Sequence, residues 1–200
     1  MFALIDNQQI TKFFSGNRGI TLGDVQYPKS IFTLWSEAER NAIGIYEVTI
    51  DTTNKKDEAY YINTNVSYGV ESNKAVGSYG IATPKRLNDE DAVDTDGNPI
   101  LDDEGNQLIN YGLKTEKKRI IKQQASKLLT DTDWYVIKAT DVAEYSVPSA
   151  VSTFRTNVRQ RSNEMETAID NAADVDALAA LYIYNEDGER PLGEFPVLEI

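Results

Sequence analysis

The chain has 200 residues, enough for one full domain or two small ones at roughly 150 residues per domain. Its 20 basic and 32 acidic side chains give a formal net charge of −12, and it contains neither cysteine nor histidine. These absences exclude disulfides, thiolate nucleophiles, zinc sites built on imidazole or sulfur, and catalysis by Ser-His-Asp or Cys-His groups.

The composition predicts a folded protein that is made and kept in a cytosol, or assembled there into something larger. Ile, Leu, Val and Phe make up about a quarter of the residues, which is above the level of highly charged disordered chains. The first residues, MFALID, lack the basic and apolar regions of a signal peptide, and no apolar run is long enough to span a bilayer. The negative charge repels phosphate backbones, so we expect no general nucleic-acid binding.

Residues 1–50 predict a small α/β head. The segments FALI at 2–5 and ITKF at 10–13 lie on either side of the turn formers Asp6-Asn7, a pattern typical of a hairpin. Ser36 and Glu39 have the spacing of a capping box, so a short helix should begin there and stop at Gly44. Residues 45–50 then alternate like a strand.

Residues 51–113 predict a β-rich middle with an acidic loop. Short candidate strands lie at 60–62, 65–68 and 75–79, separated by Asn and Gly. Their tyrosines predict an aromatic face, which is either core, the reading we favour, or an assembly surface.

The acidic loop at 88–106 contains eight Asp and Glu residues and no basic residue, and holds two similar turns flanking Ile100-Leu101. Asp94, Asp96 and Asn98 fit the first ligands of an EF-hand calcium loop, but Pro99 and Gly105 stand where Gly and Glu are required. We favour a solvated acidic turn and predict no metal site and no cofactor. The alternative is an acidic accessory protein that binds calcium or a host factor through residues 89–104.

Residues 114–200 predict a C-terminal helical region, so the fold class is α+β. Apolar residues at helical spacing predict one helix from Thr115 to a turn at 130–134 and a second from Pro148 to about residue 173. Asp174 can cap a third, short helix. The tail after Gly188 should be extended, and it needs another surface to order it.

The charged groups of the helical region indicate no enzyme. Six basic residues between Lys114 and Lys127 could contact nucleic acid or an acidic partner, but a solvated helix face is the interpretation we favour. The chain has no phosphate-binding loop, and its carboxylates have no apolar surroundings that would raise a pKa for acid–base work. We therefore predict no catalytic residue.

The segment LLTDTDW at 128–134 precedes a helix that carries Phe154-Arg155 and Val158-Arg159. This pattern resembles the C-terminal region of tail fibre assembly proteins and related small tail proteins of tailed bacteriophages. In that family a basic helix ends in Leu-Leu-x-x-Thr-Asp-Trp, and a second helix carries an aromatic-Arg pair and a hydrophobic-Arg pair. The FALIDN start, Tyr27-Pro28 and the block at 35–48 are similar to marine phage versions, whereas residues 51–113 match no part of the pattern.

The resemblance implies a non-enzymatic tail-associated protein, located in the virion tail or in the host cytoplasm during assembly. It would act as a fibre assembly factor or as a structural part of the tail or fibre attachment. Its structural motif would comprise Leu128, Leu129, Thr132, Asp133, Trp134 and Phe154. We expect the leucines to pack beneath Trp134, Thr132 or Asp133 to cap the helix end, and Phe154 to form the opposing wall. An exposed Trp134 would instead be a candidate for a partner contact.

The partners predicted are tail or tail fibre proteins and further copies of this chain. The contacts would use residues on the outer face of the second helix and on the tail, namely Arg155, Arg159, Arg161, Phe195 and Leu198. We expect an oligomer because the three parts are small and the tail is apolar. Phage tails have threefold and sixfold symmetry, so the resemblance favours a trimer. The alternative is that the tail folds back on its own helices.

Overall fold

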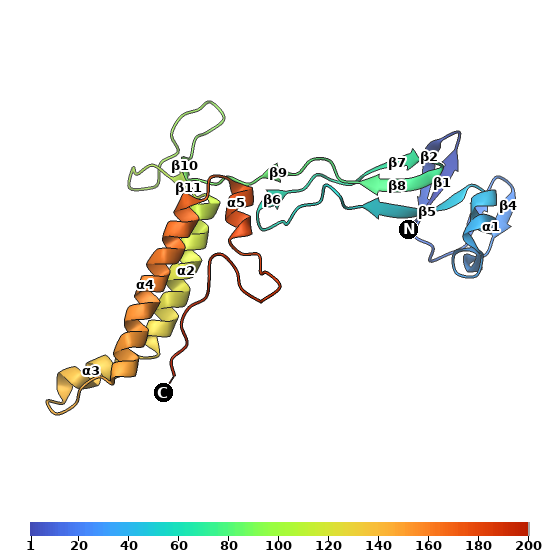
Figure 1. Ribbon diagram of the computed structural model, residues 1–200. Helices are drawn as coiled ribbons and strands as arrows, with labels where there is room; N and C mark the ends of the chain where they lie inside the picture. Colours follow the sequence, from blue (N-terminus) through green and yellow to red (C-terminus); the bar gives the residue numbers. More distant parts are fainter. Residues whose placement is uncertain (200) are drawn as a thin grey trace. The chain divides into compact units, whose positions relative to one another are not determined.

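The computed structural model describes residues 1–199 and has the predicted α+β composition (Figure 1). The chain divides into two compact units, Met1–Thr83 and a second that begins at Pro84. The boundary falls inside the stretch 51–113, so the expected β-rich middle is not a separate part. Its strands belong to the first unit and its acidic loop to the second.

The first unit is built on a five-stranded sheet in the order β2-β1-β5-β8-β7. Its strands are β1 (Phe2–Asp6), β2 (Gln9–Phe14), β5 (Ile45–Asp51), β7 (Ser67–Glu71) and β8 (Lys74–Ser78). Neighbouring strands are antiparallel except for β5 and β8, which are parallel, with Val48 opposite Ala75.

The sheet curls so that its two edge strands approach each other. The Phe13 ring on β2 lies 4.9 Å from the Tyr68 ring on β7, edge to face. The hairpin turns at the ends of these strands also meet, because Gln8 Nε2 donates to Asn73 Oδ1 at 2.7 Å. Both residues have positive φ, as the tight turns of twisted hairpins require.

Short elements cover the core of this unit. They are β3 (Ile20–Leu22), β4 (Val25–Tyr27), the 3-10 helix η1 (Lys29–Phe32) and α1 (Glu37–Ala42). The buried side chains here are Ile20, Ile31, Phe32 and Ile45, with Phe2, Phe14 and Trp35 packed around them. The predicted capping box of Ser36 and Glu39 is confirmed, and so is the left-handed Gly44.

Two further strands, β6 (Tyr61–Ile62) and β9 (Thr83–Pro84), are only two residues long. The tyrosines of this stretch differ in how deeply they are buried. Tyr60 and Tyr61 are buried, as a core reading requires, whereas the Tyr68 ring is 44% exposed.

The second unit contains an antiparallel pair of long helices, α2 (Leu113–Thr130) and α4 (Ser149–Asn171), which lie side by side in Figure 1. The predicted apolar stripe of α4 is buried along its whole length, from Val151 to Ala172. Asp174 caps the third helix, α5 (Val175–Ala180), by accepting a hydrogen bond from Ala177 N, as predicted.

The segment between the two long helices differs from the prediction. Instead of a turn and an irregular stretch, it forms a further helix, α3 (Asp133–Asp141). None of the α3 residues is buried, so the sequence lacks the periodic apolar pattern that would have indicated a helix there.

The acidic loop folds into three short hairpins that meet at one point, and we call residues 90–110 the trefoil. The stem hairpin is formed by β10 (Glu90–Asp91) and β11 (Ile109–Asn110). The other two hairpins are closed by the pairs Val93–Pro99 and Leu101–Gln107. The two similar turns predicted from the sequence are the tips of these hairpins, with Gly97 and Gly105 at positive φ.

Candidate functional site

The residues of the family-like motif converge where α2 ends, and the centre of this junction is Arg155 on α4. Its Nη1 donates to the carbonyl oxygen of Leu129 at 2.7 Å and to Oγ1 of Thr132 at 2.6 Å. Its Nη2 lies 2.8 Å from Oδ1 of Asp133. Because the Arg155 side chain is only 12% exposed, this guanidinium links the end of α2 to the start of α3.

Thr132 completes the end of α2, as predicted. The Thr132 hydroxyl donates to the Leu129 carbonyl oxygen at 2.8 Å. Its oxygen atom, Oγ1, also accepts a hydrogen bond from Arg155. Helix ends leave carbonyl groups without intrahelical partners, and this hydroxyl supplies one. Thr132 is 2% exposed, so its polar atom is buried and fully used.

The apolar part of the motif forms a small core between the helices. Ala125, Phe154 and Val158 are buried, and Leu128 and Leu129 pack against them. Phe154 therefore occupies the predicted position opposite the leucines.

The predicted position of Trp134 is wrong. The indole is 51% exposed and does not belong to the leucine cluster. It lies on α3 against the ring of Tyr135, at 3.8 Å between centroids, with the Lys138 ammonium group 5.9 Å from the indole centroid. The physical reason is α3 itself, which begins at Asp133 and carries Trp134 away from the end of α2.

The five predicted partner-contact residues divide into two groups. Only Arg159 lies on the exposed face of α4, whereas Arg155 is engaged in the junction. Arg161 donates to the Glu194 carbonyl oxygen at 3.1 Å and to a Glu164 carboxylate oxygen at 2.9 Å. Phe195 and Leu198 pack on the buried core of α2 and α4, so the tail folds back on its own helices.

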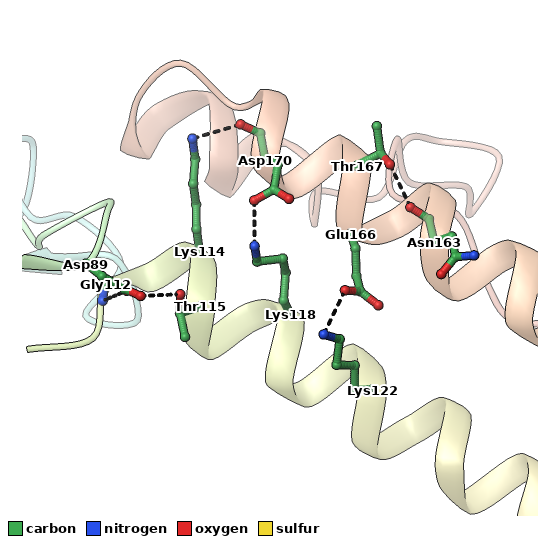
Figure 2. Close-up of polar contacts among 10 residues, drawn as sticks. All are labelled: Asp89, Gly112, Lys114, Thr115, Lys118, Lys122, Asn163, Glu166, Thr167 and Asp170. Carbon is green, nitrogen blue, oxygen red and sulfur yellow. Dashed lines mark hydrogen bonds and ion pairs between the residues drawn. The ribbon is translucent and has the colours of Figure 1, made fainter. Parts of the chain in front are cut away.

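The basic face of α2 is paired with acidic groups of α4 (Figure 2). Lys118 Nζ lies 2.7 Å from an Asp170 carboxylate oxygen, and Lys122 Nζ lies 3.2 Å from Glu166. Lys114 Nζ donates to the Asp170 carbonyl oxygen at 2.9 Å. Three of the six basic residues in the cluster are thus engaged with α4 inside the chain, rather than forming the purely solvated face that we expected.

Asp89 caps the start of α2, a role that no local sequence pattern indicates. Its Oδ1 accepts from Gly112 N at 2.7 Å and its Oδ2 accepts from the Thr115 hydroxyl at 2.9 Å, as Figure 2 shows. Gly112 precedes α2 and has no side chain to cap it, so a carboxylate from the acidic loop does so. The two residues are 23 positions apart, and no local pattern connects them.

The carboxylates of the two trefoil tips are used inside their own turns. Oδ1 of Asp94 accepts from the backbone N–H groups of Asp96 and Asn98, and Oδ1 of Asp102 accepts from those of Glu104 and Asn106. The backbone bonds from Asn98 and Asn106 are the largest cause of a pKa lowered from its ordinary value in Asp94 and Asp102 respectively. Within residues 1–199, no group of three or more acidic side chains is placed to hold a metal ion.

No helix in the described part of the chain has both the length and the apolar character needed to cross a membrane. Comparisons with protein-family models, with curated proteins and with solved structures find no match to this chain.

Proposed function

We propose that the protein is a non-enzymatic tail-associated protein of a tailed bacteriophage, acting as a fibre assembly factor or as a structural part of the fibre attachment. The observation that supports this proposal is the convergence of the motif at one junction. Leu129, Thr132 and Asp133 lie where α2 ends and α3 begins, and all three contact Arg155, a residue of α4 that is 26 positions from Leu129 and 23 from Thr132.

The difference in burial between Trp134 and the other motif residues also supports a binding role. Five of its members build the junction or its core, namely Leu128, Leu129, Thr132, Asp133 and Phe154. Trp134 is 51% exposed, and it lies on a helix without a buried residue. A large aromatic side chain that contributes little to the interior is suited to contact a partner.

The test is to co-express the chain with the fibre protein encoded by the same phage genome. We expect more soluble fibre trimer with the chain than without it, and co-purification of the two proteins. An unchanged yield together with no co-purification contradicts the proposal.

Mass spectrometry of purified virions separates the two forms of the proposal. Stoichiometric copies of the chain in the particle indicate a structural part, and their absence indicates an assembly factor.

We also propose that the chain functions as an oligomer or in a complex and not as a free monomer, and phage tail symmetry makes a trimer the first expectation for an oligomer. The folded-back tail removes one of the reasons for this expectation, because Phe195 and Leu198 are already used within the chain. Light scattering after size-exclusion chromatography decides the matter, since a strictly monomeric 22.4 kDa species, alone and with the fibre, contradicts it.

A further inference from the structure

The trefoil has an internal threefold symmetry with a period of eight residues. Ala92, Ile100 and Leu108 form a closed ring of backbone hydrogen bonds. Ala92 N donates to Leu108 O at 2.8 Å, Leu108 N to Ile100 O at 2.9 Å, and Ile100 N to Ala92 O at 2.9 Å. The three hairpins leave this ring at equivalent positions, because the pairs Val93–Pro99, Leu101–Gln107 and Ile109–Asp91 correspond to one another.

One side chain closes the centre of the ring. Gln107 Nε2 lies 2.7, 3.2 and 2.8 Å from the carbonyl oxygens of Ala92, Ile100 and Leu108 respectively. The equivalent positions hold Pro99 and Asp91, and neither has an amide group to donate. The ring is thus a rigid hub that fixes the three hairpins around one axis.

Three apolar side chains lie on the same face of this hub as Gln107. Cross-strand partners point to the same face of a ladder, so Leu101 lies on the face of Gln107, and the threefold equivalence places Val93 and Ile109 there too. Val93 is 52% exposed, Leu101 53% and Ile109 37%. Exposed apolar side chains grouped in this way mark an interaction surface.

The stretch of chain that forms this face is rich in acidic residues, of which Glu90 is paired with Arg86. No lysine or arginine occurs between Arg86 and Lys114, whereas this stretch carries eight carboxylates. Two copies of the trefoil would therefore repel each other, and the charge is complementary to a basic partner. A face with three equivalent contact points fits a partner that presents three equivalent basic surfaces around an axis.

We propose that the trefoil docks on the end of a homotrimeric protein, with its hub on the threefold axis, so that one chain binds three partner subunits. This inference rests on the proposed function, which makes the trimeric fibre protein of the same phage the partner. Val93, Leu101 and Ile109 each contact one subunit, and the acidic hairpin tips face basic side chains around the axis.

The test measures the affinity of the purified fibre trimer for the full chain by biolayer interferometry and the stoichiometry by native mass spectrometry. We expect one chain per fibre trimer, so the chain would act in a complex with the fibre and not as a trimer of its own. Val93→Ala, Leu101→Ala and Ile109→Ala should each weaken binding by a similar factor, roughly tenfold. The control Ile62→Ala, at a residue 60% exposed in the first unit, should leave the affinity unchanged.

A second arm tests the acidic tips. Asp96→Asn combined with Asp103→Asn should weaken binding at low salt and have little effect at high salt. The turn at 185–189 has the same pattern of hydrogen bonds, from Asp187 N and Glu189 N to Asn185 Oδ1. Glu186→Gln combined with Asp187→Asn in that turn is the matched control.

The outcomes are distinguishable. Wild-type binding that survives all three alanine substitutions, or three chains per trimer, overturns the trefoil surface and leaves the proposed function standing. No binding of the wild type to the fibre overturns both.

Discussion

At the scale of single residues, Arg155 and Trp134 exchange the roles that the motif suggests. An arginine next to an apolar stripe is expected in solvent, and a tryptophan after two leucines is expected in the core. The structure instead buries the guanidinium, where it has three polar partners, and leaves the indole half exposed. A planar guanidinium can serve several acceptors at once, which a tryptophan N–H cannot.

Replacing Arg155 with methionine should therefore destabilise the second unit. The side chain keeps its length, but the hydrogen bonds to Leu129 and Thr132 and the ion pair with Asp133 are lost. We expect the free energy of unfolding to fall by about 2–3 kcal/mol. Arg159→Met, one turn further along α4 on its exposed face, should change it by less than about 0.5 kcal/mol. Urea denaturation measures the free energy of unfolding of both variants. Equal losses would show that the contacts of Arg155 do not stabilise the second unit.

Trp134→Ala should leave stability nearly unchanged, with a loss below about 1 kcal/mol, because the indole packs mainly on Tyr135 of the same helix. Phe154→Ala is the comparison, since it removes a buried ring and should cost about 3–4 kcal/mol. Thermal melts monitored by circular dichroism compare the two variants. A Trp134→Ala loss as large as that of Phe154→Ala would contradict the exposed position of the indole.

At the scale of elements, the two hairpin tips of the trefoil have equivalent carboxylates, so the titration of one can be compared with that of the other. The pKa of Asp94 and that of Asp102 are both lowered from an ordinary value of 3.8 by hydrogen bonds within the turns. A lowered folded pKa means that each carboxylate stabilises its turn above the unfolded pKa. This contribution is lost as the pH falls through the folded pKa.

We therefore expect the tips to loosen only at pH values below about 4. Asn98→Ala removes the amide that bonds to the Asp94 carboxylate and should raise the pKa of Asp94 while leaving that of Asp102 unchanged. Carboxyl carbon NMR titration follows the two groups separately. A shift of equal size in both would show that the turns do not act independently.

The sequence predicted the elements whose signals are local. The capping box at Ser36 needs only Glu39, and the long stripe of α4 repeats over several turns, so both were found. Asp89, Arg155 and the tail residue Phe195 make contacts far along the chain, which no short pattern encodes. The eight-residue repeat of the trefoil is visible in the sequence as two similar turns. Its third member is the stem hairpin of β10 and β11, which only the structure reveals.

At the scale of the whole molecule, each unit has its own hydrophobic core. Ile31 and Ile45 are fully buried in the first unit, and Val158 and Ile169 in the second. Chains with more than one domain commonly depart from a single two-state transition. Because each unit buries its own core, the two units should unfold as separate cooperative transitions.

The two tryptophans report on this directly, because Trp35 belongs to the first unit and Trp134 to the second. Trp134→Phe leaves Trp35, in the first unit, as the only tryptophan of the chain, and Trp35→Phe leaves Trp134, in the second. In these backgrounds Ile31→Ala should lower the urea midpoint reported by Trp35 and leave that of Trp134 in place, because the cavity costs about 2–5 kcal/mol in one core only. Val158→Ala should do the reverse. Midpoints that move together in both backgrounds would show that the chain unfolds as one cooperative body.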